Sequence, residues 1–199
     1  VNDGPMCIHN QETEAENALY QLKEGRIAEM LTSFGLQLEQ FSASQKNSLA
    51  SYLPLLRSNK PLQLVHNTFT SFTDIQVAEE MHSDLYWCFC PKANQYIERR
   101  LPNIPQFVKS GVKCTLGTDS LASNHTLSIL EEMKCIQKAY PTISLETLIQ
   151  WATVNGAEFL GIEKEYGSIE LGKKANVIAL SRLKEKVIRQ DCDVEIVCA

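Results

Sequence analysis

The sequence has no surplus of positive charge and no apolar run long enough to cross a bilayer. It carries 19 Lys and Arg against 24 Asp and Glu in 199 residues, a formal net charge of −5. Nucleic-acid-binding proteins neutralise phosphates with a basic surplus, so no nucleic acid partner is expected. No run approaches the ~20 apolar residues of a transmembrane helix, and the N-terminus does not read as a signal peptide. We therefore expect a cytoplasmic protein without a membrane partner.

A disulfide framework and a serine-hydrolase elbow are also missing. The seven cysteines are an odd number, and several lie in apolar runs such as Tyr86–Cys90. This pattern favours free, buried thiols in a reducing compartment. Ser120 is not part of a Gly-x-Ser-x-Gly motif, which argues against it as a nucleophile. The remaining composition, 44% apolar and 22% charged, is that of an ordinary globular protein.

Short apolar runs alternate with stretches of helical periodicity. The runs are rich in β-forming residues and cover Met6–His9, Leu62–His66, Leu85–Cys90 and Val112–Gly117. The helical stretches that follow them are Thr13–Lys23, Thr73–His82, Ile104–Ser110 and Leu127–Ala139. Strands alternating with helices predict an α/β fold with a parallel sheet. The insertion Arg26–Pro61 has the spacing of two amphipathic helices.

The remainder of the chain departs from this alternation. Two helical stretches, Leu145–Thr153 and Gly156–Leu160, precede strand candidates at Ala175–Ser181 and Val194–Cys198. We expect an α/β unit at residues 1–164 and a small β tail at residues 165–199. Four strand–helix pairs are half of a (β/α)8 barrel, which takes ~250 residues. Composition alone leaves open a small open sheet or a piece of a larger barrel.

Histidine and acidic residues lie where the predicted strands end. His9 ends the first run, and Glu12 follows it. His66 ends the second run, and Asp119 follows the fourth. The carboxyl ends of parallel strands meet at one rim, where imidazole and carboxylate groups can bind Zn²⁺ and a glutamate can move a proton of an activated water. The alternative is structural, with satisfied histidines and helix-capping acidic groups.

A charged segment, Glu98–Leu101, follows the third run. Its Arg99 or Arg100 could bind an anionic or carboxylate-bearing substrate. The alternative is a solvated loop.

These residues also carry a family resemblance. The matching segments are His9–Thr13, Val65–His66, Cys90–Asn94, Gly111–Asn124, Leu130–Met133 and Tyr166–Ile178. Together they resemble the C-terminal half of a metal-dependent amidohydrolase of the cytosine-deaminase, S-adenosylhomocysteine-deaminase and chlorohydrolase branch. The resemblance covers nearly the whole chain, and Leu116–Asn124 is its most specific part. It implies strands five to eight of a TIM-like barrel, followed by the return to a small composite β-sandwich.

The resemblance also implies roles for single residues. His9 and Asp119 would ligate one divalent metal, with zinc favoured and iron the alternative. Glu12 would be the proton shuttle, and Asp119 would accept a proton from the attacking water. His66 would polarise the substrate or stabilise the attacking group, and Asn94 would help to shape the substrate pocket. The implied reaction is hydrolysis of a non-peptide C–N bond, with loss of ammonia from a purine-like or pyrimidine-like ring.

One departure from the family pattern is the missing His-x-His pair of the first barrel strand. The histidines are His9, His66, His82 and His125, and no two of them are two residues apart. Catalytic zinc usually has three protein ligands, and this chain offers His9 and Asp119, or three ligands if His66 joins. We therefore expect a fragment of a longer enzyme, inactive alone. Its partner would be the missing N-terminal half or a second copy of the chain in a homo-oligomer.

Two other functions remain open from the sequence. The same site could remove a different leaving group, such as chloride. The chain could instead serve assembly without catalysis.

Overall fold

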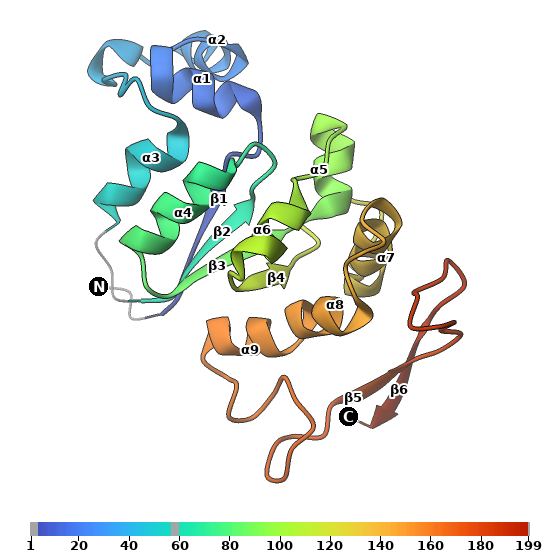
Figure 1. Ribbon diagram of the computed structural model, residues 1–199. Helices are drawn as coiled ribbons and strands as arrows, with labels where there is room; N and C mark the ends of the chain where they lie inside the picture. The colour runs from blue at the N-terminus through green and yellow to red at the C-terminus, as the bar shows by residue number, and fades with distance from the viewer. Residues whose placement is uncertain (1–3, 57–59, 199) are drawn as a thin grey trace.

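The computed structural model describes residues 4–56 and 60–198. Residues 1–3 and 199 of the two expected units, and residues 57–59 of the expected insertion, lie outside it. The described chain forms a parallel sheet with helices packed on it and an antiparallel tail (Figure 1). The predicted mixed α/β fold with a parallel sheet is confirmed.

The parallel sheet has four strands in the order β1-β2-β3-β4. Their bounds are β1 (Met6–Asn10), β2 (Leu62–His66), β3 (Leu85–Phe89) and β4 (Cys114–Leu116). The register places His9 beside Val65 and Asn10 beside His66. β4 is shorter than the predicted Val112–Gly117, although Trp87 N donates to Lys113 O (2.9 Å). All four carboxyl ends therefore lie at the same edge of the sheet.

Most helices begin at a residue whose side chain caps them. The helices after the strands are α1 (Glu14–Leu22), α4 (Phe72–Met81), α5 (Pro91–Glu98), α6 (Ile104–Ser110), α7 (Ile129–Ala139), α8 (Leu145–Ala152) and α9 (Val154–Leu160). Thr13, Ser71 and Ser128 each accept a hydrogen bond from the first turn of α1, α4 and α7. α5 was not predicted and starts with Pro91 at its first helical position. It places a helix directly at the end of β3.

The insertion between β1 and β2 contains the two predicted helices. They are α2 (Arg26–Ser33) and α3 (Ser48–Tyr52), with short 3-10 turns at η1 (Leu38–Gln40) and η2 (Leu53–Leu55). The Tyr52 hydroxyl donates to Asn10 Oδ1 at 2.6 Å, in a buried position. This bond ties the insertion to the carboxyl end of β1.

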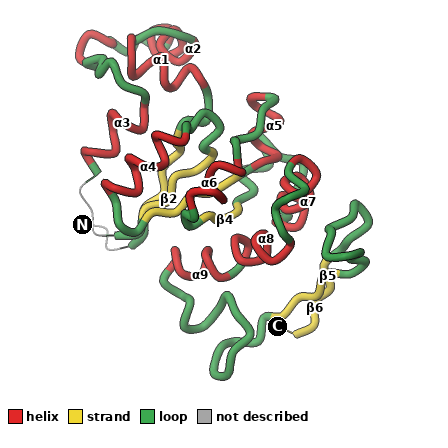
Figure 2. The backbone as a smooth tube through the Cα atoms, in the orientation of Figure 1, coloured by secondary structure: helices red, strands yellow, loops and turns green. Residues whose placement is uncertain are grey.

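The core lies between one face of the sheet and the helices. Leu62, Leu64, Trp87 and Phe107 are fully buried on this side, where α4 and α6 cross the strands (Figure 2). The opposite face of the sheet is less covered at β1, as the exposed Cys7 shows. No helix among the described residues is both long and apolar enough to cross a membrane.

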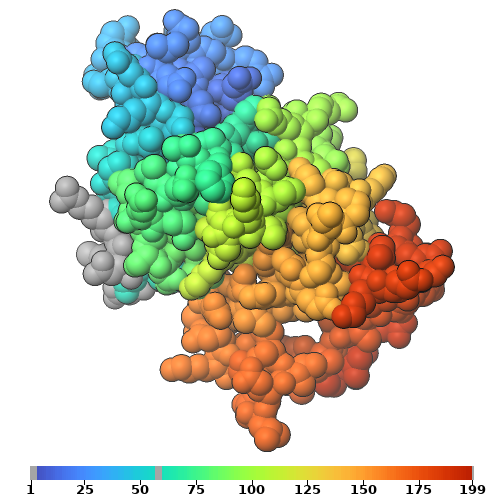
Figure 3. Space-filling model, in the orientation of Figure 1, coloured from blue at the N-terminus to red at the C-terminus, as the bar shows by residue number. Residues whose placement is uncertain are grey.

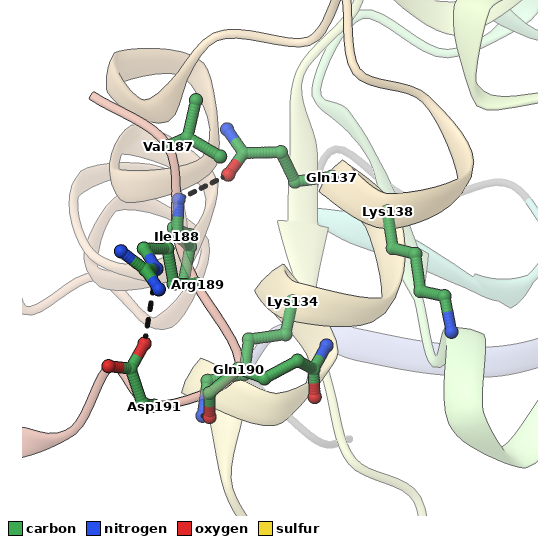
Figure 4. A pocket seen from close by; sticks show the side chains of 8 residues that line it. All are labelled: Lys134, Gln137, Lys138, Val187, Ile188, Arg189, Gln190 and Asp191. Carbon is green, nitrogen blue, oxygen red and sulfur yellow. Dashed lines mark hydrogen bonds and ion pairs between the residues drawn. The ribbon is translucent and has the colours of Figure 1, made fainter. Parts of the chain in front are cut away.

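The tail is an antiparallel pair, β5 (Val177–Leu180) and β6 (Val194–Cys198). It projects from the body of the molecule in the space-filling view (Figure 3). The loop between its strands returns to α7, where Ile188 is buried and its N–H donates to Gln137 Oε1 at 2.6 Å. A groove beside this contact is lined by Lys134, Gln137, Lys138 and residues 187–191 (Figure 4). The loop anchors the tail through Ile188, and Leu180 at the end of β5 also packs against the core.

We expect Ile188→Ala to lower the free energy of unfolding by about 2–4 kcal/mol, because a buried isoleucine side chain is truncated where the tail meets α7. Val187→Ala is the matched control, since Val187 is 48% exposed, and it should cost less than about 0.5 kcal/mol. Urea unfolding followed by circular dichroism measures both. Equal losses for the two variants would contradict an anchoring role for Ile188.

Candidate functional site

Three neighbouring positions at the carboxyl edge of the sheet adopt left-handed backbone conformations. The φ angles are +44° at Gln11, +78° at His66 and +56° at Asp119. Such angles are uncommon for residues with a side chain, and for His66 they are costly unless the surrounding structure enforces them. They turn the chain sharply at the ends of β1, β2 and β4. The turns lie next to the polar side chains that the sequence singled out.

His9, His66 and Asp119 come together at this edge. Each offers one ligand atom, and these atoms all lie within 4.8 Å of one another. The imidazole rings of His9 and His66 are stacked, with centroids 5.1 Å apart and an interplanar angle of 27°. His9 is exposed, Asp119 is half-buried and His66 is buried. The site is therefore closed on the His66 side and open on the His9 side.

Glu12 lies beside the buried histidine. Its Oε1 is 3.5 Å from His66 Nε2. Burial raises the pKa of Glu12, and the charge of Asp119 raises it further, whereas His9 lowers it. Burial, together with His9, lowers the pKa of His66 to about 4. At neutral pH the His66 imidazole is uncharged, so its contact with Glu12 is a polar contact between a carboxylate and a neutral ring.

Asn94, on α5, contacts the other side of the His66 ring. It is fully buried, and its Nδ2 lies 3.2 Å from His66 Nδ1 and 2.9 Å from Thr68 Oγ1. With the amide group donating to Nδ1, the proton of the neutral imidazole is on Nε2. Nε2 is the nitrogen that faces Glu12. Asn94 thus reaches the site through His66.

Hydrogen bonds also fix the loops that carry Glu12 and Asp119. Glu16, in the first turn of α1, accepts from the backbone N–H of Gln11 (3.0 Å) and of Glu12 (3.2 Å). Ser123 Oγ donates to Asp119 Oδ2. Sequence reasoning did not single out Glu16 or Ser123. The signal for Glu16 was its position three residues after Thr13, the spacing of a capping box.

The two arginines lie outside the His9, His66 and Asp119 group. Both are exposed, and Arg99 ends α5 in a left-handed conformation. The Arg100 guanidinium lies over the Phe69 ring, 4.7 Å from its centroid. Phe69 belongs to the loop after β2, and its N–H donates to Gln11 O at 3.0 Å. Arg100 therefore lies against a loop that borders the site.

The donor set fits a divalent metal. The imidazole of His9 and the carboxylate of Asp119 are ligands of the kind that zinc takes in catalytic sites, and the His66 ring lies beside them with both of its nitrogens facing protein groups. The structure thus brings His66 within reach of the two ligands expected from the sequence. The residues present are chemically suited to the metal that the resemblance implied.

Comparisons with known proteins identify the family of the chain and solved structures of similar fold. The model of the amidohydrolase family matches residues 3–198. The 5-methylthioadenosine/S-adenosylhomocysteine deaminase of Thermodesulfovibrio yellowstonii is 32% identical over 126 residues, covering 60% of this chain and 28% of the relative. The solved aminofutalosine deaminase of Helicobacter pylori has a TM-score of 0.71 at 22% identity, covering 86% of this chain and 43% of that one. A zinc-bound adenosine deaminase from Xanthomonas campestris has a TM-score of 0.66 at 24% identity, covering 88% and 37%.

The chain spans less than half the length of each of these relatives. The structural likenesses support the fold, and the family model covers nearly every residue. The resemblance found in the sequence is confirmed, and the chain belongs to the amidohydrolase family.

Proposed function

We propose that the protein is a metal-dependent hydrolase of non-peptide C–N bonds that deaminates an amino-substituted heteroaromatic ring, such as a nucleobase or nucleoside. The convergence of His9, His66 and Asp119 beside Glu12 carries the proposal. A histidine and an aspartate would hold the metal, and a carboxylate and an imidazole would remain for proton transfer and hydrogen bonding. Relatives named as deaminases of adenosine derivatives support this substrate class.

His9 and Asp119 would hold one divalent metal, with zinc favoured and iron the alternative. When bound, such a metal supplies Lewis acidity and brings the pKa of a water ligand toward neutrality. The zinc in the Xanthomonas campestris deaminase supports the choice of metal. His9 is exposed, so a metal held there would be open to further ligands from another part of the protein.

Glu12 would move the proton that the reaction requires. Its burial raises its pKa, which favours a carboxyl group able to take up a proton and then donate it. The proton would go to the ring nitrogen of the substrate. Asp119 would accept a proton from the attacking water and pass it to the exocyclic amine, which leaves as ammonia. The remaining hydroxyl proton would return to Glu12.

His66 would act as a hydrogen-bond donor. Its Nε2–H, set by the Asn94 amide on Nδ1, faces the Glu12 side of the site. A neutral donor can stabilise negative charge that develops on the attacking or departing group without competing for the metal. We therefore favour the role of His66 as a polarising group over a role as the third metal ligand.

For the substrate pocket we propose Asn94, Arg99 and Arg100 as contributors. Asn94 would shape it from behind His66. The exposed arginines would attract an anionic group of a substrate, and Arg100 lies on the loop side of the site.

We infer that the four parallel strands are the fifth to eighth of a (β/α)8 barrel within a unit at residues 1–164, and that residues 165–199 belong to a small composite β domain. The relatives' longer chains and the exposed Cys7 and His9 on one face of β1 support this. β1 and β4 are the outer strands of the sheet and would pair with the missing strands. These would come from the N-terminal half of a longer polypeptide or from a second copy, and the chain alone would be inactive.

Activity with ring-amine substrates tests the function. The complete protein would be incubated with adenosine derivatives, free purines and pyrimidines, and with a chlorinated triazine, while ammonia and chloride are measured. Ammonia release supports deamination, and chloride release alone would replace it with dechlorination. Absence of both, in protein that contains the metal, would favour an assembly role.

Metal content tests the incomplete ligand set. The isolated 199-residue chain should hold well below one zinc or iron per chain after desalting, because its ligands are few and His9 is exposed. The complete protein should hold about one, as expected for a mononuclear catalytic site with its full ligand set. Elemental analysis on protein of confirmed mass measures both. Near one metal per isolated chain would show that this half suffices or that two copies complete the site.

A further inference from the structure

Glu132 is an acidic residue without solvent contact. It lies on α7, and its exposed fraction is 0%. Burial raises the pKa of Glu132, while its hydrogen bonds to Lys92 and Asn124 lower it. A buried carboxylate is costly unless its oxygens are hydrogen-bonded. Both oxygens of Glu132 have partners, one in the first turn of α5 and one in the loop after β4.

One oxygen holds the start of α5. Glu132 Oε2 accepts from the backbone N–H of Lys92 at 2.9 Å. This N–H is in the first turn of the helix, where backbone donors have no partner inside the helix. Two residues further along α5 is Asn94, whose amide contacts His66. The position of α5 therefore determines the hydrogen bond behind the His66 ring.

The other oxygen holds the loop after β4. Glu132 Oε1 accepts from Asn124 Nδ2 at 2.7 Å. The same Nδ2 donates to Thr118 O at 2.8 Å, directly before Asp119. Asn124 Oδ1 also accepts from Thr126 N at 3.3 Å. The carboxylate is thus two hydrogen bonds away from the backbone that orients Asp119.

We propose that Glu132 is a positioning residue that locks the Asp119 loop to the start of α5, and so keeps Asp119 and the Asn94–His66 pair in a fixed relation. Glu132 is not among the residues proposed to bind the substrate or the metal. The inference rests on the proposed function for its catalytic consequence, but the lock itself is a property of the Asp119 loop and the start of α5.

The first test replaces Glu132 with glutamine in the complete protein. Glutamine keeps the shape, but it has one carbonyl oxygen for two donors, so one of the two bonds is lost. Hydrogen–deuterium exchange followed by mass spectrometry should show exchange about tenfold faster or more in residues 118–124 or residues 91–98, with α4 unchanged. Glu146→Gln is the matched control, because Glu146 is exposed on α8 and pairs with Lys186, outside both segments. It should leave both segments unchanged.

A second variant separates the two arms of the lock. Asn124→Ala removes the bonds to Glu132 and Thr118 but leaves Lys92 N bonded to Glu132 Oε2. Exchange should accelerate in residues 118–124 and not in residues 91–98. If residues 118–124 and 91–98 exchange as slowly in both variants as in the unsubstituted protein, the lock does not exist.

The catalytic consequence is read from metal affinity and kinetics. Glu132→Gln should weaken metal binding about 10–100-fold, as loss of an outer-shell partner does, and lower kcat with little change in KM. A fall in Tm with unchanged metal affinity and kcat would show a merely structural role and overturn the proposal. If the unsubstituted protein neither holds metal nor releases ammonia, the proposed function fails, and the exchange experiment still decides whether the lock exists.

Discussion

Asparagine in place of Asp119 is expected to lower kcat/KM of the complete enzyme by at least ~10³-fold, at the upper range for loss of a proton-transferring group, and to reduce its metal content. Asp119 lies with His9 and His66 in one group of ligand atoms within 4.8 Å. An amide oxygen carries no charge, so it is a weaker ligand and cannot accept a proton. The backbone at Asp119 has a φ of +56°, which asparagine tolerates well. The variant should therefore fold.

The control for this variant is Asp191→Asn. Asp191 is half-exposed in the tail, where its carboxylate is 3.4 Å from Arg189 Nε, and its removal makes the same change of charge. Steady-state kinetics and elemental analysis are measured on both variants, and His9→Ala should match the Asp119 variant. Full turnover with normal metal content in Asp119→Asn would exclude Asp119 as a ligand and as a proton acceptor.

Glutamine in place of Glu12 is expected to lower kcat by ~10²–10⁴-fold, the usual contribution of a positioned acid–base group, while metal content stays unchanged. The Glu12 carboxylate lies 3.5 Å from His66 Nε2, and burial raises its pKa. The amide keeps the shape and the polar contact but cannot take up or release a proton. Loss of rate without loss of metal is the signature that separates a proton carrier from a ligand.

Glu14→Gln is the matched control, because Glu14 is exposed in the first turn of α1, two residues away. It should retain full kcat. Single-turnover measurement with a ring-amine substrate isolates the chemical step from product release. If Glu12→Gln turns over at the normal rate, or if it loses metal in proportion to activity, Glu12 does not shuttle the proton.

The parallel sheet could be predicted from the sequence because its strands are short and apolar and alternate with capped helices. Leu62–His66 was predicted with its observed bounds, and Leu85–Cys90 to within one residue. The helix α5 was missed because its first turn depends on a distant partner. Lys92 N donates to Glu132, forty residues further along the chain. The pattern of apolar residues around Lys92 gives no sign of that bond.

The candidate site was predictable as far as strand ends determine it. His9, His66 and Asp119 lie at or just beyond the carboxyl ends of three different strands, and parallel strands bring such residues to one edge. Which side chains contact these three residues was not predictable. Asn94 is fully buried behind His66, which no spacing in the sequence indicates. Its contact depends on where α5 packs.

The strands of the sheet lie in space in the same order as in the chain. A ribosome delivers the chain from its N-terminus, so each new strand finds the edge of the one made before it. β3 and β4 can join as soon as they emerge, since short connections close quickly. The 51 residues between β1 and β2 make the first pairing the slow one. The interval between the synthesis of β1 and that of β2 is therefore the stage at which this sheet is most exposed to mispairing, and substitutions in β1 should affect yield more than those in β4.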